Sequence, residues 1–212
     1  MIWLKNPSVD QNFITTRKNV LSDKAIKVID SYISERREQS GEVLTADASA
    51  NSDTEKRKLR ISNILWINSG DDETKHLFNN IADVVNKVNE QYFNYNLYAL
   101  ENLQYSVYYG DENGHYDWHI DGLHKDTSKY IRKVSFSIGL NDPSEYEGGE
   151  LQFFPQHYYD TNDQYGIAAN GGAKLLKNEA VFFNSVLVHR VSPVTKGVRK
   201  SLVGWVHGPE WI

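Results

Sequence analysis

The chain has 212 residues, 23 lysines and arginines against 28 aspartates and glutamates, and no cysteine, for a formal net charge of −5. This length suits one domain with a sizeable core, and the lack of cysteine excludes disulfides and thiolate metal sites. The basic residues are scattered except over 56–60, which argues against a nucleic-acid partner. Residues 1–7 show no apolar signal segment and no later run approaches a membrane span, so we expect a cytoplasmic protein without membrane partners.

Two amphipathic segments in the first half predict helices. The first begins after Ser22, whose hydroxyl can cap it, and covers about 22–38, while the second covers about 72–93. Between them, residues 40–55 are rich in Ser, Ala, Asp and Asn and predict a long mobile loop, which a strand over about 61–67 follows. We expect both helices to support a sheet.

From about residue 97 onward the pattern changes to strands separated by Gly, Asn and Pro turns. The expected strands cover residues 104–109, 133–140, 149–154, 173–176, 179–183 and 200–207. The pair Gly148 and Gly149 predicts a turn with positive φ. We expect a single domain over 1–212, with helical support over about 1–96 and a β core over about 97–212.

His119 and Asp121 form the most informative motif of the chain. Residues i and i+2 of an extended segment point to the same side, so these two side chains can bind one ion. Two imidazoles and one carboxylate on one face of an octahedral ion are the ligand set of non-haem Fe(II) oxygenases. The apolar run 180–189 predicts a buried strand that ends at His189 and can deliver the third ligand.

Periodicity alone leaves alternatives open at this motif. Polar groups occupy alternate positions from His115 through Asp117 and His119 to Asp121, so the pattern does not choose the ligands. His115 and His119 also have the i, i+4 spacing of a zinc-binding helix, although flanking glycines count against a helix there. A zinc hydrolase stays open, because this ligand set does not separate zinc from iron. Structural roles are expected for four histidines: His115, His124, His157 and His207.

From about Gln104 to Trp205 the chain resembles the prolyl 4-hydroxylase-like branch of the Fe(II)/2-oxoglutarate-dependent dioxygenases. Three blocks carry the resemblance, and their order and spacing are more specific than any one of them. They are YDWHID at 116–121, LNDP at 140–143 followed by EGGEL at 147–151, and HRVSPVTKGVR at 189–199. The resemblance implies an α+β, mainly β fold: a double-stranded β-helix, or jelly roll, buttressed by N-terminal helices.

The resemblance also implies the roles of the site residues. Fe(II) would be bound by His119, Asp121 and His189, and Arg199 would pair with the distal carboxylate of the cosubstrate 2-oxoglutarate. An arginine suits that role because its planar fork meets a carboxylate with two parallel hydrogen bonds. Ser201 follows on the same strand face and can add a hydroxyl to the same carboxylate.

Aromatic residues are expected to complete the site. Within the family a tyrosine from an earlier strand often contacts 2-oxoglutarate, and Tyr108 is favoured here over Tyr105 and Tyr109. Three further aromatic residues lie near the motifs, of which one or two are expected to line the substrate cleft: Tyr116, Trp118 and Trp205.

The chemistry implied is hydroxylation of an unactivated C–H bond by Fe(II), 2-oxoglutarate and O₂, with succinate and CO₂ as co-products and ascorbate as a stimulant. The expected substrate is a prolyl residue of a peptide or protein, or free proline or a related amino acid. The alternatives are another small metabolite, or a metal-binding jelly roll that serves as a sensor or binding module. Arg199 separates these, because only a 2-oxoacid cosubstrate requires a deep cation opposite the metal. Residues 122–130 are expected to form a mobile wall of the substrate entrance, with 40–55 as the alternative.

Overall fold

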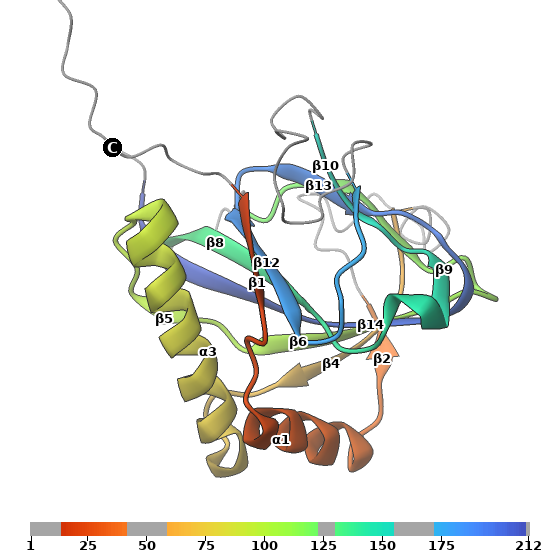
Figure 1. Ribbon diagram of the computed structural model, residues 1–212, viewed down its shortest axis with the longest axis horizontal. Coiled ribbons are helices and arrows are strands. Elements are labelled where there is room, and N and C mark those ends of the chain that lie inside the picture. Colours follow the sequence, from red (N-terminus) through yellow and green to blue (C-terminus); the bar gives the residue numbers. More distant parts are fainter. Residues whose placement is uncertain (1–13, 42–58, 123–129, 155–171, 211–212) are drawn as a thin grey trace, which may run out of the picture.

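Two antiparallel β-sheets form the centre of the computed structural model, which describes residues 14–41, 59–122, 130–154 and 172–210 (Figure 1). We call them the major and the minor sheet. The two segments expected at the substrate entrance lie almost wholly outside the described residues, at 42–58 and 123–129. Among the helices described, none has the length and apolar character needed to cross a membrane.

The strand order is that of two sheets joined by repeated crossovers. The major sheet runs β1 (Ile14–Lys18), β12 (Glu179–Asn184), β8 (Tyr130–Gly139), β14 (Val194–Pro209), β6 (Leu103–Tyr109), β4 (Asn63–Ile67) and β2 (Gln39–Ser40), with β5 (Ala99–Leu100) and β9 (Tyr146–Gly148) also paired to β14. The minor sheet runs β11 (Gly172–Ala173), β10 (Leu151–Phe154), β13 (Val188–Val191), β7 (His115–His119) and β3 (Arg60–Ile61). Residues before 97 therefore supply strands to both sheets as well as helices.

Both expected helices are confirmed, with small differences at their ends. In α1 (Asp23–Ser34) the Ser22 hydroxyl accepts a hydrogen bond from the backbone N–H of Ala25 at 3.2 Å. The helix ends before residue 38, and the chain then enters β2. The second segment is a 3₁₀ helix (Asp72–Thr74), then α3 (Lys75–Val88), then a short π-helix (Asn89–Phe93) that ends where Asn94 adopts a left-handed φ of 52°.

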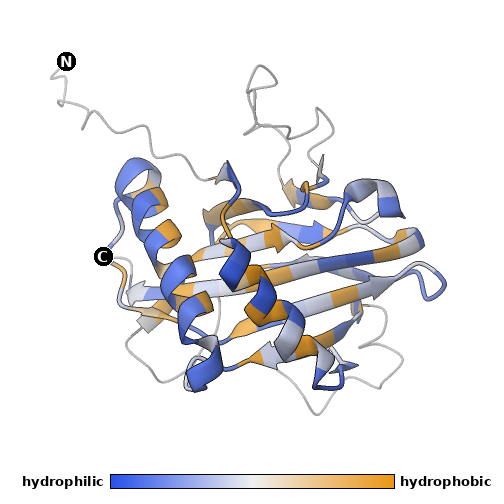
Figure 2. Cartoon of the chain, turned by 60° about the horizontal axis from the view of Figure 1, so that its bottom comes forward, coloured by the Kyte–Doolittle hydropathy of each residue, from blue (hydrophilic) through white to orange (hydrophobic). Residues whose placement is uncertain are grey.

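Strand alternation divides the apolar residues between two cores. Phe182 points outward and packs with residues of α1 and α3 such as Ile29 and Leu77, whereas Phe183 points inward and packs with Phe153 of β10. Figure 2 shows that each helix has one hydrophobic and one hydrophilic side. The helices thus close the outer face of the major sheet, and its inner face is left to the minor sheet. This arrangement is the buttressed jelly roll that the sequence implies.

The prediction of one continuous strand over 180–189 is wrong, because this segment forms parts of two strands, β12 and β13. The chain leaves the major sheet after Asn184, and Leu187 donates its backbone N–H to the Asn184 carbonyl at 2.9 Å. The Asn184 side chain also accepts from the backbone N–H of Val186 at 3.1 Å. Because an asparagine that binds its own downstream backbone makes a turn, the apolar run folds into two strands. His189 consequently lies on β13 in the minor sheet.

Candidate active site

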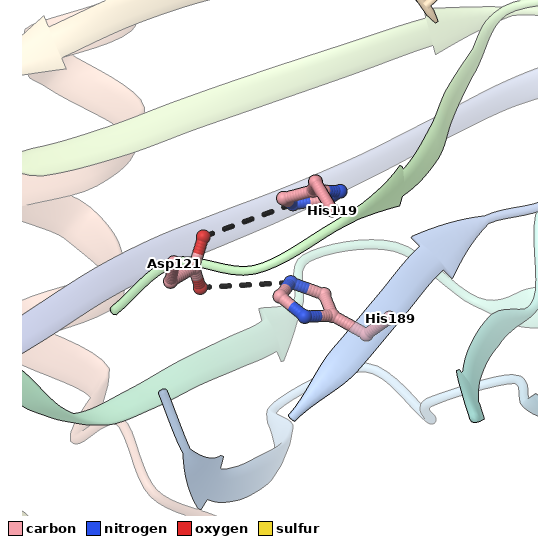
Figure 3. Close-up of side chains that lie close together, drawn as sticks. All are labelled: His119, Asp121 and His189. Atoms are coloured by element: carbon pink, nitrogen blue, oxygen red, sulfur yellow. Dashed lines mark ion pairs between the residues drawn. The ribbon is translucent and has the colours of Figure 1, made fainter. Parts of the chain in front are cut away.

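Three side chains with metal-binding groups meet between the sheets: His119 at the end of β7, Asp121 beyond it, and His189 on β13 (Figure 3). His119 Nε2 lies 3.7 Å from Asp121 Oδ1, and His189 Nε2 lies 3.5 Å from Asp121 Oδ2. With metal–ligand bonds of about 2.1 Å, ligand atoms at neighbouring corners of an octahedron lie roughly 3 Å apart. All three ligand atoms lie within 4.8 Å of one another, so a shift of roughly one to two ångströms would bring them onto one ion.

A β-bulge in β7 aims His119 at this point. His189 pairs with His119 and Val191 pairs with Tyr116, so two steps along β13 match three along β7. A bulge of this kind re-aims side chains and is frequent beside active sites. The rings of Tyr116 and His119 consequently lie on one side and stack, with centroids 3.6 Å apart.

Both imidazoles are held with Nε2 directed at the carboxylate. His119 Nδ1 lies 2.7 Å from the Asp117 carbonyl, and His189 Nδ1 lies 2.9 Å from the Leu187 carbonyl. A carbonyl only accepts, so Nδ1 carries a proton, and Nε2 is the nitrogen that faces the site and can bind a metal. This donor set, two imidazoles and one carboxylate, fits Fe(II) or a similar divalent ion.

The charges of the site also suit a cation. Burial raises the pKa of Asp121, but the two neighbouring histidines, together with the polar groups of Ser135 and Trp205, outweigh it and hold that pKa below its usual value. The Trp205 indole N–H is buried and makes no hydrogen bond of ordinary length among the described residues. It nevertheless lies close enough to Asp121 to stabilise the charged form of that carboxylate. Burial and the neighbouring His189 lower the pKa of His119 to about 4, so its imidazole is neutral at physiological pH.

The three metal-binding groups line a cavity of about 350 Å³, and Arg199 on β14 lines the same cavity. Arg199 is buried, and its Nη1 donates to Ser201 Oγ at 3.0 Å. It pairs across the strands with Tyr108, and its guanidinium lies 5.2 Å from the centre of that ring. The three expected cosubstrate residues are thus side by side, and Arg199 has no carboxylate partner among the residues that the structure describes.

The other two tyrosines considered for this pocket lie elsewhere. Tyr105 lines a separate cavity on the helix side of the major sheet, and burial raises its pKa. The Tyr109 hydroxyl donates to Glu38 at 3.2 Å. Tyr146 of β9, which sequence reasoning missed, lies close to Arg199: burial raises its pKa, and the Arg199 charge and hydrogen bond act in the opposite direction. It was missed because β9 is a three-residue strand without a pattern of its own.

The glycine pair forms the expected turn and also shapes the Arg199 pocket. Gly148 and Gly149 have φ values of +72° and +69°. A Cβ at Gly149 would lie 2.9 Å from Cδ of Arg199 and 2.9 Å from Cγ2 of Val194. Only glycine allows both the turn and the close approach of the backbone to the arginine.

Other residues divide between the cavity and the surface. Tyr116 and Trp205 line the cavity, as does Arg60, which the sequence presents only as one member of a basic run. Trp118 lies outside it with 39% of its surface exposed. Of the remaining histidines, His115 and His207 are not part of the metal cluster. His124 and His157 lie outside the described residues.

Comparison with known proteins agrees with this geometry. Residues 103–207, which contain the three clustered groups and Arg199, match the sequence model of the 2OG-Fe(II) oxygenase superfamily. The chain belongs to this superfamily. Its members use Fe(II), 2-oxoglutarate and O₂, and this chain has a His-Asp-His cluster.

The relatives are hydroxylases by name. A PKHD-type hydroxylase of Nitrosomonas europaea is 39% identical over 95 residues, which cover 43% of this chain and 37% of the relative. A PKHD-type hydroxylase of Picosynechococcus is 42% identical over 79 residues, covering 37% and 30%. The match thus spans only about a third of the length of these relatives.

Solved structures share the fold across nearly the whole chain. A prolyl-4-hydroxylase of Pseudomonas putida superposes with a TM-score of 0.62 at 19% identity, covering 93% of this chain and 94% of that one. A Trichoplax adhaerens prolyl hydroxylase, solved with a peptide of hypoxia inducible factor, gives 0.65 at 19% identity, covering 93% and 84%. At these identities the likeness shows the fold.

Proposed function

We propose that this protein is an Fe(II)- and 2-oxoglutarate-dependent dioxygenase that hydroxylates an unactivated C–H bond. One observation carries the proposal: the His119, Asp121 and His189 cluster and the buried Arg199 open into one cavity. A zinc hydrolase or a metal-binding sensor has no need for a buried cation facing the metal, whereas a dicarboxylate that chelates the metal at one end needs one at the other.

The chain's own residues have separate tasks in this proposal. His119, Asp121 and His189 hold the ion, Arg199 binds the distal carboxylate of 2-oxoglutarate, and Ser201 and Tyr108 add hydroxyls beside it. The ion, with 2-oxoglutarate and O₂, would supply the oxidising power, with succinate and CO₂ as co-products. Apolar side chains from both sheets, among them Phe136 and Phe183, line the cavity and would limit the access of water to the reacting positions.

For the substrate, we propose a prolyl residue of a peptide or protein, or free proline or a related amino acid. The names of the structural neighbours, which are prolyl hydroxylases, support this class. Another small metabolite is the runner-up. We also propose that the chain forms a single domain, since the helices share one core with the major sheet. The cytoplasm is the compartment that we propose for it.

The direct test is succinate formation by the purified full chain with Fe(II), ascorbate and 2-oxoglutarate. We expect succinate with Fe(II) and none with Zn(II), together with a product that has gained one oxygen by mass spectrometry when proline-containing peptides or amino acids are present. A folded, Fe(II)-binding protein that consumes no 2-oxoglutarate would contradict the proposal and favour the binding module.

A further inference from the structure

The LNDP block at residues 140–143 has no part in the site described so far, yet its asparagine reaches the strand that carries Arg199. Asn141 Nδ2 donates to the Val198 carbonyl at 2.8 Å, and Asn141 Oδ1 accepts from the Lys200 backbone N–H at 2.8 Å. These two bonds hold the peptide groups on both sides of Arg199. Asn141 is itself buried, with 8% of its surface exposed.

The two bonds fill a gap in the pairing of β14. On one side, β6 pairs with β14 from Val198 onward. On the other, β8 pairs with it only from Ser201 and β9 only up to Gly197. Within the described ranges, the backbone around Arg199 therefore has a neighbouring strand on one side only. The Asn141 amide offers the same donor and acceptor as a peptide group, so it takes the place of a strand there.

The chain on both sides of Asn141 is held in place by its own hydrogen bonds. Before it, Leu140 donates its backbone N–H to a carbonyl of β14 at 3.1 Å. After it, the Asp142 side chain accepts from the backbone N–H of Ser144 at 2.9 Å, and the Glu145 side chain accepts from the backbone N–H of Asp142 at 2.8 Å. This reciprocal capping fixes the start of a 3₁₀ helix, so the asparagine is presented to β14 by a rigid turn.

Arg199 needs a fixed backbone because its side chain is long and flexible. Its Nη1 donates to Ser201 Oγ at 3.0 Å, and its Cδ lies against Gly149, where a Cβ would come within 2.9 Å. These contacts hold the side chain, and Asn141 holds the backbone from which it starts. An arginine forms two parallel bonds with a carboxylate only in a narrow range of orientations, so a displacement of about 1 Å should weaken binding.

We propose that Asn141 is a positioning residue for the cosubstrate: its side-chain amide fixes the backbone of Arg199, so that the guanidinium is aligned with the distal carboxylate of 2-oxoglutarate. This inference rests on the proposed function. Asn141 belongs neither to the metal-binding cluster nor to the lining of its cavity, and instead lines the separate cavity on the helix side of the major sheet. Its effect on the cosubstrate therefore passes through Arg199.

The test compares Asn141→Leu with a matched control on α3. Asn80 makes the same pair of bonds elsewhere: its Nδ2 donates to the Val20 carbonyl at 2.7 Å, and its Oδ1 accepts from the Ser22 backbone N–H at 2.8 Å. Asn80→Leu therefore removes the same two bonds from a segment that does not line the cavity of the metal site. Both replacements keep the approximate size of the side chain and add no charge.

Calorimetry on the full chain, loaded with Fe(II) and kept free of O₂, measures the Kd for 2-oxoglutarate without turnover. Asn141→Leu should raise this Kd by roughly 5- to 30-fold and leave the affinity for Fe(II) unchanged. Asn80→Leu should change neither constant, although urea unfolding should show that both variants lose stability. The pair Asn141→Ala and Asn80→Ala repeats the comparison with smaller side chains, which keeps the test valid if Asn141→Leu folds poorly.

A double variant separates positioning of Arg199 from a general loosening of the pocket. If Asn141 acts through Arg199, Asn141→Leu should raise the Kd no further in a chain that already carries Arg199→Ala. An equal rise with and without the arginine would show that Asn141 acts by another route, and would overturn the inference.

Two further outcomes would overturn it while leaving the proposed function intact. One is an Asn141→Leu protein that binds 2-oxoglutarate as tightly as the wild type, and the other is the same rise in Kd for Asn80→Leu. Failure of the folded, Fe(II)-loaded wild type to bind 2-oxoglutarate would instead remove the proposed function, and the inference with it.

Discussion

The two sheets supply the cavity in different ways. On the major sheet, Arg199, Ser201, Val203 and Trp205 occupy every second position of β14, in unbroken register with β8 from Ser201 through Val206. On the minor sheet, the backbone around the three metal-binding groups is irregular. His119 follows a bulge, Asp121 lies beyond the end of β7, and His189 follows the turn after β12. Regular strands space groups several ångströms apart, which suits an extended cosubstrate. Bringing three groups within 4.8 Å of one another takes irregular backbone.

The largest effect on activity should come from the minor sheet, where irregular backbone brings the metal-binding groups together. His189→Ala removes one of three ligands, so it should abolish turnover and greatly weaken Fe(II) binding, while circular dichroism shows an intact fold. Metal affinity is measured by titration with Fe(II) under anaerobic conditions. Unchanged affinity would mean that the cluster does not hold the ion.

Arg199→Ala tests the major sheet, whose regular strand β14 carries this arginine. Loss of a desolvated carboxylate partner, worth about 2–4 kcal/mol, should raise the apparent KM for 2-oxoglutarate by tens to hundreds of times. Metal binding should survive, because Arg199 is not in the cluster. Steady-state kinetics with 2-oxoglutarate as the varied substrate measure the change, and a normal KM would place the acid elsewhere.

The pH dependence of stability sharpens the contrast, because His119, on the minor sheet, is the one histidine with a strongly shifted pKa among the residues that the structure describes. The pKa of His119 is about 4 in the fold against 6.5 for an ordinary histidine. The unfolded chain therefore binds a proton first as pH falls, and the metal-free protein should lose up to roughly 3 kcal/mol of stability between pH 6.5 and pH 4. Asp121, whose pKa is also lowered, acts with the same sign below its usual value of 3.8.

Urea unfolding of the metal-free protein across this window measures the loss. His119→Gln should show a flatter dependence between pH 6.5 and pH 4, since it removes the group that titrates. Identical slopes for the wild type and the variant would assign the titration to other groups.

Tyr108→Phe should have the smallest effect. It removes one hydroxyl beside Arg199 and keeps the ring, so KM for 2-oxoglutarate should rise by roughly 3- to 10-fold, as for one hydrogen bond. Tyr105→Phe is the control, because Tyr105 faces the helix side and should leave KM unchanged. A rise for Tyr105→Phe alone would reverse the choice between the two.

This difference between the sheets also explains what the sequence could predict. Alternation on β14 was enough to expect Arg199 and Ser201 on one face, and the Ser22 cap marked the start of α1. The bulge in β7 leaves no pattern in the sequence, so periodicity could not separate His119 from His115. The family motif supplied that choice.

Long-range pairing explains the rest of what was missed. The apolar run around Asn184 resembles one strand, and only its pairing with two different sheets shows that it is two. Arg60 stands in a basic run, and nothing local indicates that it crosses to Gln104, 44 positions away. Such residues are found by tertiary structure alone, because their partners are distant in the chain.

The 16-residue strand β14 has a consequence for the kinetics of binding. It pairs with β8 on one side and with β6 on the other over much of its length. Amide protons in its centre should exchange with solvent only through global unfolding, because no smaller opening frees both neighbours. The wall that carries Arg199 therefore exists before any ligand arrives, and association requires little ordering of this strand. The rate at which 2-oxoglutarate binds is then set by its passage into the cavity.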